Sequence, residues 1–166
     1  LQLEINRDGK KFFIEFNNGE TKSSLKIIGK SKETGTKITF LPSKDVFSSI
    51  KFSGNIIIKR MRELAFLNKG IKITFTDGSF KKEKVEEFKF DGGVVQFVEF
   101  LDDKREKLKN KNDNDLFKKP IQIEGKNNGV DIECALKWNA SFAEDVLPYT
   151  NNIYQKDGGT HLLGFR

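Results

Sequence analysis

The chain has 166 residues, of which 36% are hydrophobic and 33% charged, so a packed core is possible and wholesale disorder is disfavoured. The formal net charge is 30 − 24 = +6 and lies in residues 1–91 (19 basic, 12 acidic) rather than 92–166 (11 basic, 12 acidic), which permits an anionic partner such as a nucleotide or DNA without requiring one. A single cysteine excludes an internal disulfide, one cysteine and one histidine make no convincing zinc site, and no apolar run approaches the roughly 18–20 residues of a membrane span.

The first part of the chain follows the pattern of short antiparallel strands. Apolar and polar side chains alternate over residues 1–6, and a partner strand is predicted over 11–16. Asp8-Gly9 lies between them and suits a type I′ turn, in which both central residues need positive φ. A sheet is therefore predicted here, completed by turn residues at 17–19 and by short strands over 25–28 and 37–40.

The apolar period becomes helical over residues 55–69, where an apolar stripe lies opposite charged side chains. Two strands follow over 71–76 and 85–90, and a turn at Gly78 joins them. A second helix is predicted to open at Gly92-Gly93, because apolar residues recur there at helical spacing. In the helix predicted over residues 55–69, the charged side carries Lys59, Arg60, Arg62 and Glu63.

The last third is predicted to hold a hairpin and the start of a helix. Strands over 121–123 and 130–138 flank turn residues, and the alternation in the second strand makes Cys134 a buried, inert thiol. Asp157-Gly158-Gly159-Thr160 is a tight turn in which the glycines allow positive φ and Thr160 can cap the helix that follows.

The order of elements favours an α+β fold with antiparallel strands over a doubly wound sheet. The boundary between two domains is expected near Asp91-Gly92-Gly93, where a sheet ends and a unit of helix and hairpin begins. Leu1 starts directly on a strand pattern, and Arg166 falls about one turn into an uncapped helix. The chain is therefore expected to be a piece of a larger protein.

Several stretches along the chain resemble the B subunit of DNA gyrase, the ATP-hydrolysing subunit of the bacterial type II topoisomerases. The resemblance covers the whole length. It is carried by Thr150–Ile153 with Gly158–His161, by Arg60–Gly70, by Phe90–Gly93, by Ala135–Asn139 and by Thr34–Thr36.

The resemblance implies two partial domains. Residues 1–91 would be the C-terminal part of a GHKL-type ATPase domain, an α/β sandwich, and residues 92–166 the N-terminal part of a transducer domain of the ribosomal-S5-domain-2 type. It also implies ATP and Mg²⁺ as cofactors, DNA and the gyrase A subunit as partners in an A2B2 assembly, a B-subunit homodimer on ATP binding, no membrane, and a bacterial cytoplasmic, nucleoid-associated location.

Four residues take expected roles from the same resemblance. Thr36 matches the threonine that helps to hold adenine, Ile38 an apolar wall of the pocket, and Arg7 an arginine at the pocket rim where coumarin-type inhibitors reach. Arg166 matches an arginine that faces the DNA cavity, where a guanidinium contacts phosphates without reading sequence.

No catalytic residue and no magnesium ligand is expected in this chain. In the family, the general-base glutamate and the magnesium-binding asparagine precede the position of Leu1, and the groups that reach the γ-phosphate follow that of Arg166. Hydrolysis needs a positioned base and charge stabilisation, so the isolated chain is expected to be inactive. Two alternatives stay open: a B-type subunit of topoisomerase IV, and a passive nucleic-acid-binding module.

Overall fold

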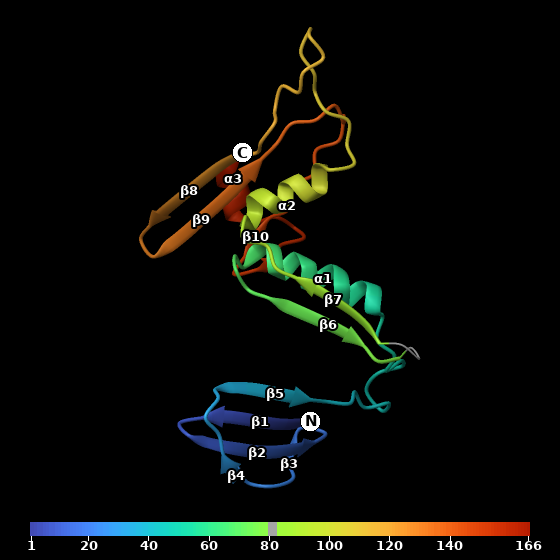
Figure 1. Ribbon diagram of the computed structural model, residues 1–166, viewed down its shortest axis with the longest axis vertical. Coiled ribbons are helices and arrows are strands. Elements are labelled where there is room, and N and C mark those ends of the chain that lie inside the picture. The colour runs from blue at the N-terminus through green and yellow to red at the C-terminus, as the bar shows by residue number, and fades with distance from the viewer. Residues whose placement is uncertain (80–82) are drawn as a thin grey trace. The chain divides into compact units, whose positions relative to one another are not determined.

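A computed structural model describes residues 1–79 and 83–166, which form two compact units, Leu1–Phe52 and Ser53–Arg166. Unit 1 is one antiparallel sheet (Figure 1). Its strands run in the order β3-β2-β1-β5, and β4 pairs with β2 beside β3. Their bounds are Gln2–Arg7 (β1), Lys10–Asn17 (β2), Glu20–Thr21 (β3), Lys26–Lys30 (β4) and Gly35–Thr39 (β5), so the predicted sheet is confirmed.

The tight turns of the sheet explain its register. Asp8 and Gly9 have φ of 51° and 76°, and Asn18 and Gly19 have φ of 49° and 89°, so both two-residue turns have the positive φ pair of type I′. This turn has a twist that matches the twist of the flanking strands, and it fixes the partners Arg7↔Lys10 and Asn17↔Glu20. The prediction made from Asp8-Gly9 is confirmed.

Unit 2 begins with a helix, α1 (Gly54–Leu67), which packs on the hairpin of β6 (Ile73–Asp77) and β7 (Lys84–Phe88). Ile58, Ala65 and Phe88 form the core between them. The predicted helix and both strands are confirmed, although the strands are shorter than predicted. The turn predicted at Gly78 runs into residues 80–82, which lie outside the described residues.

A second helix, α2 (Gly93–Asp102), packs against α1 through an aromatic cluster. The fully buried ring of Phe66 on α1 stacks on Phe90 at 3.7 Å between centroids and on Phe97 at 4.9 Å, with Phe100 at 5.4 Å. Residues on both sides of the expected boundary at 91/92 thus share one cluster, and the compact units divide at 52/53 instead. The domain boundary stays a prediction.

The remaining elements are two hairpins and a short helix. The first hairpin confirms the predicted one, with its turn at Asn128-Gly129; its first strand is longer than predicted and its second strand is two residues shorter. The inward face predicted for its second strand is wrong near the turn, where Val130 and Ile132 are each 60% exposed. The bounds are Ile121–Asn127 (β8), Val130–Leu136 (β9), Tyr149–Thr150 (β10), Ile153–Tyr154 (β11) and Thr160–Phe165 (α3).

Two details of these elements differ from expectation. Cys134 is half-buried rather than buried, and that partial burial raises the pKa of its thiol. Thr160 is the first residue of α3 and not its cap: Gly159 holds the cap position with φ of 150° and no side-chain bond.

Within residues 1–79 and 83–166, no helix has the length and apolarity needed to cross a membrane.

Candidate functional site

One face of the sheet in unit 1 carries three of the four predicted site residues. Leu3 lies opposite Ile38, and Ile5 opposite Thr36, in the pairing of β1 with β5. Residues directly opposite in an antiparallel pair share a face, and so do residues two apart on one strand. Arg7 follows Ile5 by two positions, so its side chain belongs to the same face as Thr36 and Ile38.

The two faces of this sheet differ in polarity. On the first face, Ile38 is 60% exposed, and the Arg7 side chain is 78% exposed with Asp8 at 3.8 Å. On the opposite face, Glu4 pairs with Lys11 at 2.5 Å and with Lys37 at 3.5 Å. The hydrogen bond and charge of Lys11, with a smaller effect of Lys37, lower the pKa of Glu4. The face of Thr36 is therefore open and apolar with a cation at its end, while the other face pairs its charges internally.

Arg166, the fourth predicted residue, lies at the end of α3. Its side chain is 59% exposed, and its guanidinium lies 3.4 Å from the Glu144 carboxylate. It is accessible to an anionic partner, although Glu144 already supplies part of its counter-charge. The roles predicted for all four residues stay predictions.

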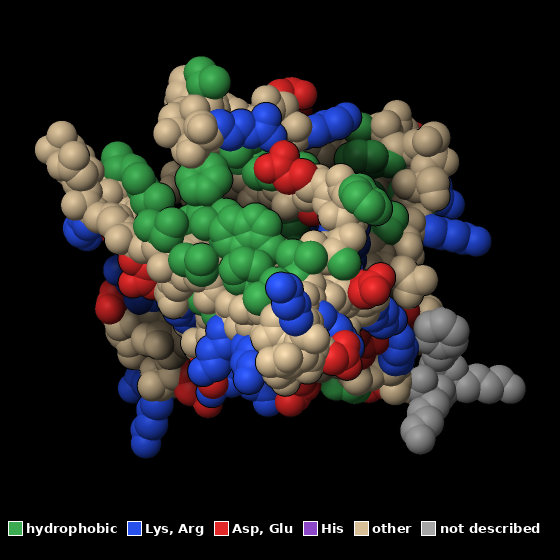
Figure 2. Space-filling model, turned by 90° about the horizontal axis from the view of Figure 1, so that it is seen from above, with side chains coloured by type: hydrophobic (Ala, Val, Ile, Leu, Met, Phe, Trp, Pro, Cys, Tyr) green, Lys and Arg blue, Asp and Glu red, His purple; other side chains and the backbone are tan. Residues whose placement is uncertain are grey.

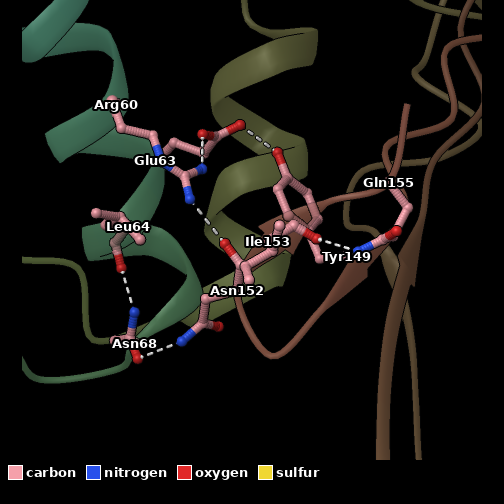
Figure 3. Close-up of polar contacts among 8 residues, drawn as sticks. All are labelled: Arg60, Glu63, Leu64, Asn68, Tyr149, Asn152, Ile153 and Gln155. Atoms are coloured by element: carbon pink, nitrogen blue, oxygen red, sulfur yellow. Dashed lines mark hydrogen bonds and ion pairs between the residues drawn. The ribbon is translucent and has the colours of Figure 1, made fainter.

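From Arg60 to its C-cap Asn68, α1 makes a set of polar contacts that the sequence did not indicate (Figure 3). Glu63 accepts hydrogen bonds from the Tyr149 hydroxyl and from the Arg60 guanidinium, each through a different carboxylate oxygen. The other end of that guanidinium donates to the Asn152 carbonyl at 2.9 Å. Asn152 in turn donates from its amide to Asn68 Oδ1 at 2.9 Å, and Asn68 donates to the last turn of its own helix.

The partner of α1 in these contacts is the small hairpin of β10 and β11. Asn151 and Asn152 form its turn with φ of 48° and 65°, a positive pair that asparagine tolerates better than most residues. That turn aims the Asn152 carbonyl and side chain at α1. Tyr149 is half-buried, and burial, followed by its hydrogen bond to Glu63, raises the pKa of its hydroxyl, so the hydroxyl stays protonated and donates.

Lys69, two residues after the end of α1, contacts the longer hairpin. Lys69 Nζ lies 2.6 Å from Glu133 on β9 and 3.4 Å from Glu124 on β8. The hydrogen bond with Glu133 is the main reason that the pKa of Lys69 is raised. The Arg60–Gly70 stretch therefore joins α1 to both hairpins while its apolar side packs on β6 and β7.

A buried ion cluster fixes the end of α2. The Asp102 carboxylate is held by Lys107 at 2.6 Å, by Lys137 at 2.8 Å and by the Asn139 amide at 2.9 Å. Burial opposes ionisation of Asp102, but these three hydrogen bonds together outweigh it and lower the pKa from 3.8 to about 2. The cluster ties α2 to the residues that follow β9.

Two negative findings limit the chemistry of the described part of the chain. None of its His, Cys, Asp and Glu side chains forms a group of three or more that could hold a metal ion. A hollow of about 350 Å³ in unit 1 is lined mainly by apolar residues, among them Phe40, Pro42, Phe47 and Phe52, and offers little to bind a polar ligand.

Sequence reasoning missed Arg60, Glu63, Tyr149 and Asn152. It assigned the first two to the charged face of a helix, and it used Thr150–Ile153 for the family resemblance without predicting a hairpin there. The available signal was the Asn-Asn pair between Tyr149-Thr150 and Ile153-Tyr154, since two residues that tolerate positive φ between β-prone residues indicate a hairpin.

Comparison with known proteins gives consistent matches. The family model for DNA gyrase B matches residues 93–166. The whole chain is 38% identical to the gyrase B protein of Borreliella burgdorferi and 40% identical to those of Rickettsia prowazekii and Halalkalibacterium halodurans. It spans only 20% to 25% of the length of these relatives.

Solved structures agree with the sequences. The 43K ATPase domain of Thermus thermophilus gyrase B, solved with an aminocoumarin, matches 99% of this chain with a TM-score of 0.80 and 33% identity, over 43% of its own length. The gyrase B protein of Myxococcus xanthus matches 99% of the chain and 46% of its own with a TM-score of 0.78, and at 20% identity this likeness concerns the fold alone. The predicted α+β class and GHKL-type architecture are confirmed. Because sequence and fold agree from one end to the other, the chain belongs to the DNA gyrase B family.

Proposed function

We propose that the chain forms part of the B subunit of an ATP-dependent type II DNA topoisomerase of the gyrase kind, which passes one duplex through a double-strand break in another. The parent subunit would use ATP and Mg²⁺, dimerise on ATP binding, assemble with an A subunit on DNA, and work in the bacterial cytoplasm on the nucleoid. The open sheet face with Arg7, Thr36 and Ile38 is the observation that carries the nucleotide-binding part of this proposal.

That face suits one wall of a pocket for a flat, polar-edged base. The Thr36 hydroxyl can both donate and accept a hydrogen bond, directly or through water, and Ile38 offers apolar surface two residues along. Residues of β1, β2 and β5 on this face are apolar, hydroxyl-bearing or basic, whereas Glu4 and Glu15 lie on the other. β1, β2 and β5 therefore present no carboxylate on the face of Thr36, and we expect the isolated chain to bind nucleotide weakly and to hydrolyse none.

The exposed surface supports a role within a larger assembly. The chain exposes 13555 Å², whereas two separate compact bodies of the sizes of the two units would expose about 10,000 Å² in total. Apolar side chains gather into a broad area on the face shown in Figure 2. Monomeric proteins rarely expose apolar patches of large extent, so this surface is suited to contact with other protein.

A pair of matched threonine variants tests the nucleotide role in the full-length subunit. Thr36→Ala should weaken ATP binding about three- to tenfold, the usual cost of one lost hydrogen bond. Thr39→Ala makes the same change on the opposite face of β5 and should leave the affinity unchanged. Equal effects of the two variants on the ATP dissociation constant would count against the pocket wall.

Two further measurements test the rest of the proposal. Arg7→Ala should lower the affinity of the full-length subunit for an aminocoumarin more than for ATP, because Arg7 lies at the end of the face. If the chain is instead a passive nucleic-acid-binding module, the isolated chain should bind duplex DNA strongly and in a salt-sensitive way. We expect at most feeble binding, and submicromolar binding at physiological salt would favour the module.

A further inference from the structure

The hairpin of β10 and β11 is attached to α1 mainly by polar bonds. Three of them cross between the two elements: Tyr149 to Glu63, Arg60 to Asn152, and Asn152 to Asn68 (Figure 3). Two of the hairpin's apolar side chains are largely exposed, Ile153 at 62% and Tyr154 at 42%, and the half-buried Tyr149 reaches α1 through its hydroxyl.

A polar attachment of this kind can open and close. Hydrogen bonds that break are replaced by bonds to water, so their net cost is small, whereas opening an aromatic stack exposes apolar surface. Three residues after Glu63, the ring of Phe66 packs against Phe90 and Phe97 and has no such freedom. α1 contacts the hairpin of β10 and β11 through polar bonds and its aromatic neighbours through stacking. The polar contact is therefore the one that can be released.

The hairpin leads directly into α3. The backbone N–H of Gln155 donates to the Pro148 carbonyl at 2.9 Å, and the backbone N–H of Gly158 donates to the Gln155 carbonyl at 3.0 Å. These bonds continue the hairpin into the Gly158-Gly159 turn, whose positive φ values precede the first residue of α3. The position of the hairpin therefore sets where the chain enters α3, the helix that precedes Arg166.

We propose that Glu63 and Tyr149 are positioning residues in a releasable polar joint between α1 and the hairpin of residues 149–154. With the joint closed, the hairpin and the start of α3 are held to α1; with it open, they move independently of it. The coupling role rests on the proposed function, because it requires nucleotide on one side of the joint and DNA on the other. A coupling element must have two states that both sites bias, and a bonded or released hairpin provides them.

Tyr149→Phe tests the joint with a matched control on the same hairpin. The substitution removes one hydroxyl and keeps the ring, and Tyr154→Phe makes the same change at a hydroxyl for which the described residues provide no hydrogen-bond partner. In the full-length subunit, hydrogen exchange of the Gln155 amide should become about tenfold faster in Tyr149→Phe, while Tyr154→Phe stays within about twofold of the parent. Equal exchange in the two variants overturns the joint.

A double variant shows whether Glu63 acts through the same bond. Glu63→Gln should speed exchange at Gln155 at least as much as Tyr149→Phe does, because it weakens the bonds to both Tyr149 and Arg60. The double variant should then exchange less fast than the product of the two single effects predicts, since both substitutions act on the same bond. Fully additive effects overturn the assignment.

Coupling is read from the number of DNA links changed per ATP hydrolysed by the assembled enzyme. Tyr149→Phe should lower this ratio at least threefold with ATP hydrolysis in the absence of DNA unchanged, a pattern that a loss of folding would not produce. An unchanged ratio in an enzyme that does hydrolyse ATP overturns the coupling role alone. If the parent enzyme hydrolyses no ATP, the proposed function fails, and the exchange measurements still decide the joint.

Discussion

Replacing Asp102 by asparagine tests how much the buried ion cluster stabilises unit 2. The Asp102 side chain is 5% exposed and that of Lys137 9%, so solvent screens their interaction little. The pKa of Asp102 is lowered from 3.8 to about 2, and a tenfold change in an ionisation constant corresponds to about 1.36 kcal/mol. The folded state therefore favours the charged form by about 2 kcal/mol.

Asparagine has nearly the shape of protonated aspartate, so Asp102→Asn should cost at least this amount at neutral pH. It also leaves Lys137 buried without its counter-charge, which raises the expected loss to about 2–4 kcal/mol. Asp103→Asn is the matched control, because Asp103 is exposed and forms no ion pair with any residue that the structure describes. The control should change the free energy of unfolding by less than about 0.5 kcal/mol.

The pH dependence of the unfolding free energy gives a second, independent test of the Asp102 cluster. A lowered folded-state pKa means that the stabilisation is complete above the ordinary pKa of 3.8 and is lost as the pH falls toward about 2. The difference between the parent chain and Asp102→Asn should therefore shrink as the pH is lowered from 5 to 2.

Urea unfolding followed by the fluorescence of Trp138, the single tryptophan, measures both effects, because Trp138 lies between Lys137 and Asn139. If Asp102→Asn unfolds like Asp103→Asn at neutral pH, the Asp102 cluster is not a stabilising one. A difference that persists unchanged at pH 2 would also refute the reasoning.

Three further substitutions follow from the packing. Phe66→Ala should cost about 3–5 kcal/mol of unfolding free energy, because Phe66 is 1% exposed, stacks on the rings of Phe90 and Phe97 and contacts the tilted ring of Phe100. Phe142→Ala, at a fully exposed ring, should cost almost nothing in the same urea titration. Gly93→Ala should cost about 1–2 kcal/mol, because φ is +59° and a Cβ would come within 2.2 Å of Lys69 Cε, while Gly125→Ala, which meets nothing within 4 Å, should cost well under 1 kcal/mol. Glu63→Gln should bring the pKa of Tyr149 down toward its ordinary value, visible as earlier tyrosinate absorbance in an alkaline titration, and no change in that titration would contradict the hydrogen bond between them.

Local sequence chemistry predicted those parts of the fold that depend on neighbouring residues. Asp8-Gly9 specifies its own turn, and the apolar stripe of α1 specifies a helix wherever its partner lies. The hairpin with its turn at Asn151-Asn152 was not predicted, because its strands are two residues long and too short for alternation to be seen. Val130 and Ile132 alternate correctly, but they lie near the free turn of their hairpin, where the described structure leaves them exposed.

The site depends on pairings that are distant in sequence. Arg7, Thr36 and Ile38 share a face only because β1 pairs with β5 as well as with its neighbour β2. Arg60 and Glu63 were assigned to a charged face because periodicity separates apolar from polar positions without saying what the polar side contacts. Their partners, Asn152 and Tyr149, lie 92 and 86 residues away.

The arrangement of polar and apolar contacts decides where unit 2 can move. Separating α1 from α2 would expose the ring of Phe66 and its stacked neighbours on both sides of residues 91/92, at a cost of several kcal/mol. Separating α1 from the hairpins breaks hydrogen bonds and the ion pairs of Lys69, which water and salt replace at much smaller cost. Helices α1 and α2 should therefore move as one body, and the hairpin of β10 and β11, which α1 holds by polar bonds, is the neighbour that can move relative to them.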